Sequence, residues 1–171
     1  MIKNKKNFNL VCFGGGYLSK AELKLIQELG LSPEKIFQVS GNDTTLANFD
    51  RSASIFVYPS LYEGFGIPLL EAMSLDCPIA CSNTSSLPEV VDNAAEFFDP
   101  EQPESMTNAM ENVLFSSDKS TELVKQAREQ LKNFSWEKAT KETKKVYLSL
   151  TLNQINYTMN NLPSKVIQNP K

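Results

Sequence analysis

Short apolar runs alternate with longer amphipathic segments over the first hundred residues of the chain. The runs have the length of strands and no polar alternation, which is typical of strands buried on both faces of a parallel sheet. They lie at 9–13, 35–40, 54–58, 78–82 and 96–99. Helical spacing is found between them at 20–29, 43–53, 68–75 and 87–91. The pattern predicts a doubly wound, Rossmann-like α/β domain with a parallel sheet.

Local signals indicate where several helices begin. Ser19 with Glu22 three residues later is a capping-box pair, and Asp43 is predicted to cap the second helix. Pro68 is predicted to be the first residue of the third helix, where its missing N–H costs nothing. Leu23, Ile26 and Leu29 are expected to line one face of the first helix.

From Pro103 onward the pattern is helical throughout. Two apolar stripes mark two helices, with Met106, Ala109, Met110 and Val113 in one and Leu123, Ala127 and Leu131 in the other. A last long helix is predicted over 136–152. Residues 153–171 are polar and irregular, so a loosely held tail is expected there. With a polar leader at 1–8, the predicted domain spans residues 9–152.

Composition excludes several classes of function. The chain has 171 residues, 41% of them hydrophobic, and a formal net charge of −3, which argues against a nucleic-acid partner because such proteins carry a basic face. No apolar run is long enough for a membrane span, and no export signal is recognisable, so a cytoplasmic location is expected. The three cysteines and the absence of histidine indicate reduced structural thiols and no metal site.

Candidate chemistry lies in the stretch YEGFGIPLLEA, residues 62–72. It places Glu63 in the loop after the third strand and Glu71 at the start of the following helix. Ligands of open α/β sheets bind at the carboxyl ends of the strands, and a helix start attracts anions. Gly64 and Gly66 are expected to allow positive φ and close approach of a ligand. The stretch therefore predicts a site for a phosphorylated, polyhydroxylated ligand.

The two acids have a structural interpretation as well. Glu71 can be an acid that favours the helix dipole from the first turn, and Glu63 can be a solvated loop charge. Taken alone, the pair does not separate a binding site from an ordinary helix start. The residues around the pair carry more information.

The run FVYPSLYEGFGIPLLEAMSLDCPIACSNTSSLPEVV closely resembles the C-terminal, donor-binding domain of retaining glycosyltransferases with the GT-B fold, the group 1 or family 4, mannosyltransferase-like family. The signature of that family is Glu, seven residues, Glu, which matches Glu63 and Glu71. The resemblance covers residues 9–150 and includes GGG after the first strand, FFDP and FSWEKA. It implies transfer of a sugar from a nucleotide-diphosphate sugar during glycan assembly, with retention at the anomeric carbon and without a metal or other cofactor.

The resemblance also implies roles for individual residues. Glu63 would be the catalytic-site acid that bonds hydroxyls of the donor sugar, and Glu71 would take the ribose hydroxyls. Other donor-binding positions are the backbone N–H groups around Phe65, Gly66 and Ile67, the side chain of Leu70, and the segment from Val39 to Gly41 near the base. Glu89 is expected to be structural.

Against the family pattern, the domain is expected to be N-terminally incomplete. In relatives, a preceding strand and helix supply an Arg and a Lys to the diphosphate, and a separate N-terminal domain binds the acceptor. That domain is an implied partner, and any peripheral membrane contact would come through it. The chain alone is expected to be inactive. The last helix crosses between domains in relatives, so its apolar side chains are expected to favour homo-oligomers.

Three other interpretations remain open. Gly14-Gly15-Gly16 lacks the third glycine of a dinucleotide fingerprint, which disfavours a nicotinamide oxidoreductase. A sugar-nucleotide epimerase shares the architecture but needs acid and base side chains from two domains. A non-catalytic sugar-nucleotide-binding or interaction module would keep the domain without its chemistry.

Overall fold

The computed structural model describes the backbone of residues 8–160 and the side chains of residues 8–152. The chain divides into two units, with the boundary between Leu131 and Lys132. The first unit ends before the last helix, which lies in the second unit, and the domain bounds of 9–152 stay a prediction.

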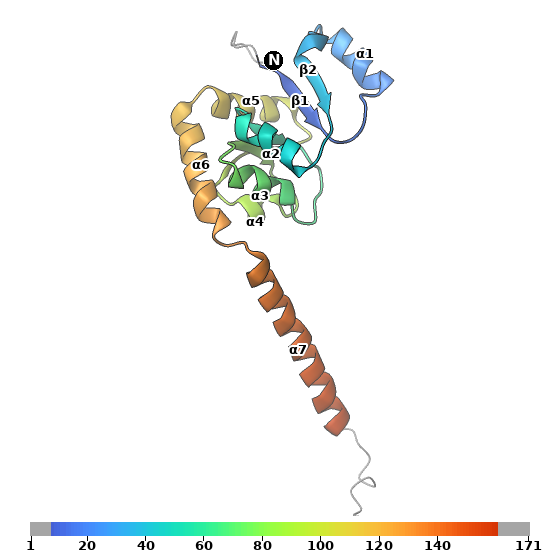
Figure 1. Ribbon diagram of the computed structural model, residues 1–171, viewed down its shortest axis with the longest axis vertical. Helices are drawn as coiled ribbons and strands as arrows, with labels where there is room; N and C mark the ends of the chain where they lie inside the picture. Colours follow the sequence, from blue (N-terminus) through green and yellow to red (C-terminus); the bar gives the residue numbers. More distant parts are fainter. Residues whose placement is uncertain (1–7, 161–171) are drawn as a thin grey trace, which may run out of the picture. The chain divides into compact units, whose positions relative to one another are not determined.

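The first unit alternates strands and helices (Figure 1). Its strands are β1 (Leu10–Phe13), β2 (Ile36–Val39), β3 (Phe56–Tyr58), β4 (Ile79–Ser82) and β5 (Ala95–Phe98). Its helices are α1 (Lys20–Glu28), α2 (Asp43–Ser52), α3 (Ile67–Ser74), α4 (Leu87–Val91), α5 (Pro103–Leu114) and α6 (Ser117–Leu131), with a short 3-10 helix, η1 (Pro33–Lys35). Each of these helices and strands overlaps a predicted one, apart from η1.

All strand pairs are parallel, as predicted, but they form two sheets instead of one. β1 pairs with β2, and a second sheet has the order β3-β4-β5. β4 is the central strand of the second sheet, and all four of its residues are buried. The prediction of an α/β domain with parallel strands is confirmed, and the break between β1 and β3 is a feature that it did not contain.

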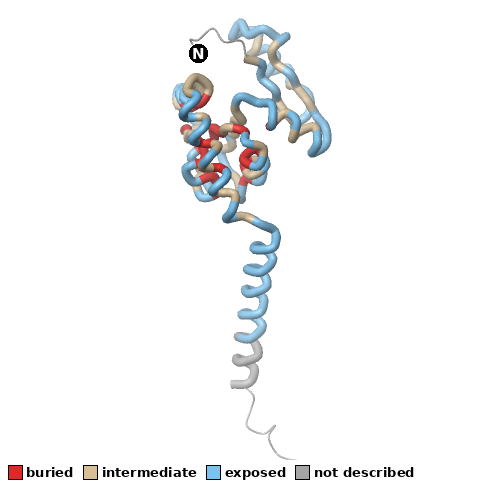
Figure 2. Tube along the Cα trace, turned by 60° about the vertical axis from the view of Figure 1, so that its left-hand side comes forward, coloured by how far each residue is buried: buried red, intermediate tan, exposed pale blue. Residues whose placement is uncertain are grey.

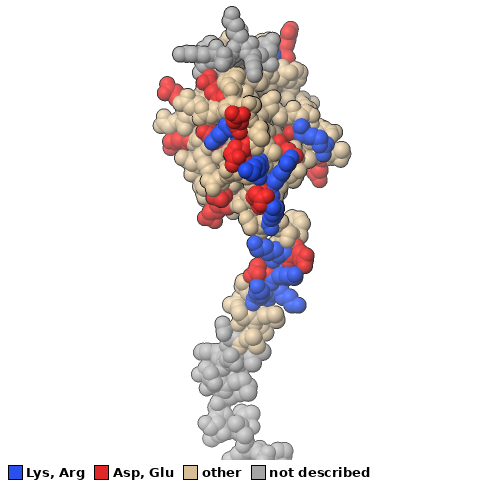
Figure 3. Space-filling model, turned by 90° about the vertical axis from the view of Figure 1, so that its left-hand side faces the viewer, with Lys and Arg blue, Asp and Glu red and all other residues tan. Residues whose placement is uncertain are grey.

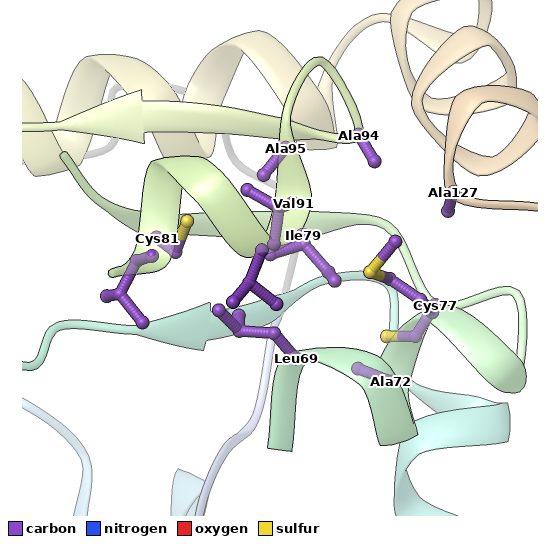
Figure 4. Close-up of a cluster of buried hydrophobic side chains, with 12 residues drawn as sticks. Leu69, Ala72, Cys77, Ile79, Cys81, Val91, Ala94, Ala95 and Ala127 are labelled. Atoms are coloured by element: carbon purple, nitrogen blue, oxygen red, sulfur yellow. The ribbon is translucent and has the colours of Figure 1, made fainter. Parts of the chain in front are cut away.

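The hydrophobic core surrounds β4. Side chains of Leu69 from α3, Ile79 from β4 and Val91 from α4 converge there, each with no solvent exposure (Figure 4). Burying one such side chain contributes about 1.5–3 kcal/mol. Two of the cysteines, Cys77 and Cys81, are buried free thiols in this core, and burial raises the pKa of each to about 12. Both are therefore structural residues.

The part that contains β1, α1 and β2 has almost no core of its own. Figure 2 shows this part in the colours of exposed and intermediate residues, whereas the buried residues gather in the rest of the first unit. α1 contains no buried residue, and Leu23 and Leu29 are 53% and 60% exposed. The apolar face of this helix is thus exposed within the described structure.

Two helix caps test the local predictions. The Ser19 capping box is present: Ser19 N–H donates to Glu22 Oε2 at 2.6 Å, and Glu22 N–H donates to Ser19 Oγ at 3.2 Å. α2 is capped by Asn42 instead of the predicted Asp43, since Thr45 N–H donates to Asn42 Oδ1 at 3.0 Å. Asp43 is the first helical residue, one position inside the cap.

The second unit consists of α7 (Trp136–Asn160). It continues eight residues past the predicted end at 152, so the predicted irregular segment is wrong for 153–160; the rest of it, 161–171, lies outside the described residues. Neither Pro nor Gly occurs between Trp136 and Asn160 to stop the helix. Basic side chains gather on its first turns (Figure 3). Among residues 8–160, no helix is both long and apolar enough to cross a membrane.

Candidate donor-binding loop

The loop between β3 and α3 carries the first predicted acid and is held by the loop that follows β4. Glu63 N–H donates to Ser85 Oγ at 3.0 Å. The Ser86 hydroxyl donates to the carbonyl oxygens of Glu63 at 2.9 Å and of Phe65 at 3.2 Å. Because carboxyl ends of neighbouring parallel strands lie at the same edge of a sheet, two loops far apart in sequence brace one another here.

The Glu63 carboxylate is positioned by two hydroxyl groups. Tyr58 Oη donates to its Oε1 at 2.7 Å, and Ser60 Oγ donates to the same oxygen at 2.9 Å. These two hydrogen bonds hold the pKa of Glu63 below its ordinary value, and the bond from Tyr58 has the larger effect. No hydrogen bond within residues 8–152 engages Oε2. The side chain is thus an ionised, oriented acceptor with one oxygen left for a ligand.

Gly66 is the N-cap of α3, and its backbone requires glycine. Its φ of 99° and ψ of 48° are left-handed. A Cβ there would lie 2.8 Å from Leu87 Cδ2 and 3.2 Å from Leu69 Cδ1. The expected positive φ is confirmed for Gly66 and is wrong for Gly64. A Cβ on Gly64 would meet nothing within 4 Å, so the space beside it is open.

The helix start is one residue earlier than predicted, which changes the role of its first residues. α3 begins at Ile67, so Pro68 is its second residue. Pro68 has no N–H, and Leu69 N–H donates to the Gly66 carbonyl at 3.0 Å. Among Ile67, Pro68 and Leu69, only Ile67 has a backbone N–H without a partner inside the described structure. The predicted anion-binding helix start therefore depends on the backbone from Gly66 to Ile67.

Glu71 lies in the second turn of α3, not in the first as predicted. It is the fifth helical residue and is exposed. The interpretation of Glu71 as a first-turn acid that favours the helix dipole is therefore wrong. Its charge reaches Asp50 of α2, which is 5% exposed. Burial, and secondly the charge of Glu71, raise the pKa of Asp50 above its ordinary value.

The remaining predicted positions divide between loop and core. Phe65 and Ile67 are exposed beside Glu63, by 43% and 50%. Leu70 is partly buried and packs against the core. Val39 ends β2, where its carbonyl accepts a bond from Gly14 N–H at 2.9 Å.

Gly41 has a packing reason of its own, because a Cβ there would lie 2.7 Å from Thr45 Cβ. No hydrogen bond or ion pair of the described residues joins Val39 or Gly41 to the loop after β3. Glu63, Gly66, Ile67 and Glu71 lie in one continuous segment, the loop after β3 and the first turns of α3, and the roles of Val39 and Gly41 stay predictions.

Four residues that position Glu63 were not predicted from the sequence: Tyr58, Ser60, Ser85 and Ser86. Tyr58 was assigned only to a strand, although a hydroxyl at the end of a strand is well placed to meet the loop that follows. The two serines follow β4, and the parallel pairing of β3 with β4 brings them to the same edge. Strand pairing was the information that could have found them.

Positive charge is missing from the segment that forms the site. The sequence holds no Lys, Arg or His between Arg51 and Lys119, and it holds eleven Asp and Glu in the same interval. No ion pair within residues 8–152 involves Glu63 or Glu71. A diphosphate bound at the loop would thus have no cationic side chain from this segment to neutralise it.

Two other possible sites do not compete with the loop. Within the described residues, no three Cys, Asp or Glu side chains are grouped as a metal centre would need, and the expected metal independence stays a prediction. A hollow of about 500 Å³ runs along α7, lined by Trp136, Ala139, Thr140, Thr143, Lys144, Tyr147, Leu148 and Thr151. All of these belong to one helix, so the hollow has no opposing wall within that unit.

Parallel strands with covering helices, and a glycine-containing loop at the carboxyl end of β3, define a Rossmann-like α/β domain. The sequence of residues 1–130 matches the family described as Glycosyl transferases group 1, and the chain belongs to that family.

Individual relatives agree with this assignment. The chain is 43% identical over 107 residues to O-antigen chain mannosyltransferase B of Escherichia coli, covering 61% of this chain and 28% of that protein. Its structure is similar to that of sucrose-phosphate synthase from Thermosynechococcus elongatus, with a TM-score of 0.72 and 25% identity, over 85% of this chain and 39% of that one.

A third similarity is to the C-terminal domain of the group 1 glycosyl transferase LpcC from Francisella tularensis, with a TM-score of 0.58 and 19% identity over 67% of this chain and 60% of that one. The chain spans between 14% and 38% of the length of the curated relatives that it matches.

Proposed function

We propose that this chain is the donor-binding part of a retaining glycosyltransferase that transfers a sugar from a nucleotide-diphosphate sugar to an acceptor during glycan assembly in the cytoplasm. The observation that carries the proposal is the Glu63 carboxylate, which two hydroxyls hold through Oε1 while Oε2 has no partner within residues 8–152. The family and its mannosyltransferase members support the reaction class.

Each part of the loop has a task in this proposal. Glu63 accepts hydrogen bonds from hydroxyls of the donor sugar, and its lowered pKa keeps it an acceptor at neutral pH. The backbone at Gly66 and Ile67 donates to the diphosphate, since a helix start attracts anions. The exposed Glu71 accepts bonds from the vicinal hydroxyls of the ribose. No metal takes part in the proposal.

The segment that forms the loop supplies no positive charge, so the diphosphate must be stabilised from elsewhere. The departing diphosphate must be stabilised by preorganised positive charge, and the interval from Arg51 to Lys119 supplies none. In this proposal the cations come from other segments of the chain or from polypeptide outside residues 1–171, which also carries the acceptor site. The same observation favours a second candidate, a sugar-nucleotide-binding module without transferase activity.

Calorimetric titration tests the donor site. Wild-type chain is titrated with UDP, GDP and their sugar conjugates, and the tightest ligand is titrated into Glu71→Ala and Glu63→Gln. Glu71→Ala is expected to weaken binding of nucleotide and sugar nucleotide alike, by about 1–3 kcal/mol for lost charged hydrogen bonds. Glu63→Gln is expected to weaken only the sugar nucleotide. Glu89→Ala, at an exposed acid of α4, is the matched control and keeps wild-type affinity.

The outcomes separate the candidates. Equal affinity of wild type and Glu71→Ala, or no binding of any sugar nucleotide, would refute the donor site. Binding without sugar transfer after the N-terminal part of a relative is supplied would favour the non-catalytic module.

A further inference from the structure

Side-chain hydroxyls join the end of β4 to the loop after β3. Ser82, Thr84 and Ser86 are alternate residues, and each donates its hydroxyl hydrogen to a backbone carbonyl within residues 58–65. The donor–acceptor distances lie between 2.9 and 3.4 Å. Because a hydroxyl has a single hydrogen, these three side chains have no donor left for a ligand.

Ser85 has the opposite hydrogen-bond direction, although it lies between two of these residues. Its Oγ accepts from Glu63 N–H at 3.0 Å, and it donates to no group within residues 8–152. Ser85 is also exposed. Its hydroxyl hydrogen is therefore available to a ligand, next to the backbone of the acid that the proposed donor site uses.

The backbone of Ser85 has a conformation that favours glycine. Its φ is 50°, which is left-handed and uncommon for a residue with a side chain. Such conformations persist where surrounding contacts enforce them, and they gather at binding sites. Glycine would relieve the strain and would also remove the hydroxyl, so the presence of serine is consistent with a use for that group.

An anionic oxygen is the ligand group that suits this hydroxyl. A hydroxyl that already accepts an N–H bond is a stronger donor, because linked hydrogen bonds polarise one another. Hydrogen bonds to a charged acceptor are in turn stronger than those between neutral groups. The sequence between Arg51 and Lys119 holds no cationic side chain, so neutral donors are what this segment can offer to a diphosphate.

We propose that Ser85 is a further donor-binding residue, whose hydroxyl donates to an oxygen of the β-phosphate of the nucleotide-diphosphate sugar. The β-phosphate is the one joined to the sugar, and Glu63 binds that sugar in the proposed function. A hydroxyl on the backbone N–H of Glu63 therefore suits the sugar end of the diphosphate. The inference rests on the proposed donor site and adds a side chain to it.

Calorimetry with matched ligands tests the proposal. Wild type, Ser85→Ala and Ser86→Ala are titrated with UDP and UMP and with GDP and GMP, and the tighter pair is used. Ser85→Ala is expected to weaken the diphosphate by about tenfold or more, as for a lost hydrogen bond to a charged group. The monophosphate, which lacks the β-phosphate, should be affected much less. Ser86→Ala is the control, because it removes a contact between the loops without removing a free donor, and it should change both affinities by the same factor.

A glycine variant separates loss of the hydroxyl from damage to the fold. Ser85→Gly relieves the left-handed backbone, so its resistance to urea should not fall by more than that of Ser85→Ala. It lacks the same hydroxyl and should show the same selective loss of the diphosphate. Phosphorus NMR of the bound diphosphate adds a direct readout, since the β-phosphorus signal should shift in both variants while the α-phosphorus signal stays in place.

The possible results distinguish this inference from the proposed function. Equal losses of diphosphate and monophosphate in Ser85→Ala would mean that Ser85 only supports the loop, and would overturn the inference. Wild-type diphosphate affinity in Ser85→Ala, together with weaker binding in Glu71→Ala, would overturn it and leave the donor site in place. Failure of the wild-type chain to bind any nucleotide diphosphate would refute the donor site and this inference together.

Discussion

Tyr58 Oη donates a 2.7 Å hydrogen bond to Oε1 of Glu63, so the last residue of β3 orients the acid of the loop that follows it. The side chain of Tyr58 packs against the core and is therefore a fixed support. A loop carboxylate that would otherwise sample several rotamers is thereby preorganised, which reduces the entropy lost on binding a ligand.

This contact predicts that Tyr58→Phe weakens sugar-nucleotide binding while it leaves the fold intact. Phenylalanine keeps the ring in the core and removes only the donor, and Ser60 remains as the second donor to Oε1. A several-fold loss of affinity is expected for the sugar nucleotide, and little change for the free nucleotide, measured by calorimetry. Tyr17→Phe, at a residue that is 99% exposed, is the control. Unchanged affinity in Tyr58→Phe would show that the orientation of Glu63 has no role.

The same contact predicts a distinct ionisation at alkaline pH. Burial, followed by the hydrogen bond to Glu63 and its charge, raises the pKa of Tyr58 from 10.0 to about 12. Since the folded state favours the neutral phenol, its contribution to stability is complete below pH 10 and is lost as the pH rises towards 12. Ultraviolet absorbance should show one late phenolate step that Tyr58→Phe removes and Tyr17→Phe retains. A titration unchanged by Tyr58→Phe would contradict the prediction.

Much of the first unit was predictable because its signals are local. Apolar runs marked the strands, and the pair Ser19 and Glu22 marked a helix start that the structure reproduces atom by atom. The choice of Asn42 over Asp43 as a cap was not predictable, because both residues are good caps in adjacent positions. The C-terminal end of α7 was missed because a polar composition was taken for a helix stop, although no breaker is present.

The residues of the site that are close in sequence were predictable, whereas those that strand pairing brings to it were not. Glu63, Gly66 and Glu71 are close in sequence, so the motif alone brought them together. The support from Ser85 and Ser86 depends on the pairing of β3 with β4, which a single sequence does not reveal. The break between β1 and β3 is also a tertiary property, since each strand separately has an interior pattern.

Alanine substitutions at the two glycines of the loop are predicted to have different effects on stability and on binding. Gly66→Ala forces a Cβ to 2.8 Å from Leu87 Cδ2 at a φ of 99°, so the free energy of unfolding should fall by about 1–3 kcal/mol. Gly64→Ala adds a methyl group into open space without positive φ, so stability should be unchanged while nucleotide affinity falls. Chemical denaturation and calorimetry on both variants check this contrast. Equal destabilisation by the two substitutions would contradict it.

The ionised carboxyl of Asp50 is predicted to lower the stability of the wild-type fold. Its pKa is raised by burial and then by the charge of Glu71, so the folded state disfavours the ionised carboxyl. Relative to acid conditions, wild type loses stability as the pH rises above the ordinary value of 3.8 and through the raised pKa. Asp50→Asn should therefore raise the free energy of unfolding at neutral pH.

The pH dependence makes this last prediction specific. The gain from Asp50→Asn should vanish at a pH where Asp50 is already protonated in wild type. It should also be smaller in a Glu71→Gln background, because that substitution removes the second cause of the raised pKa. Urea denaturation of the four proteins at neutral and acidic pH measures both effects. A gain that is equal at both pH values would mean that packing, and not the charge of Asp50, is responsible.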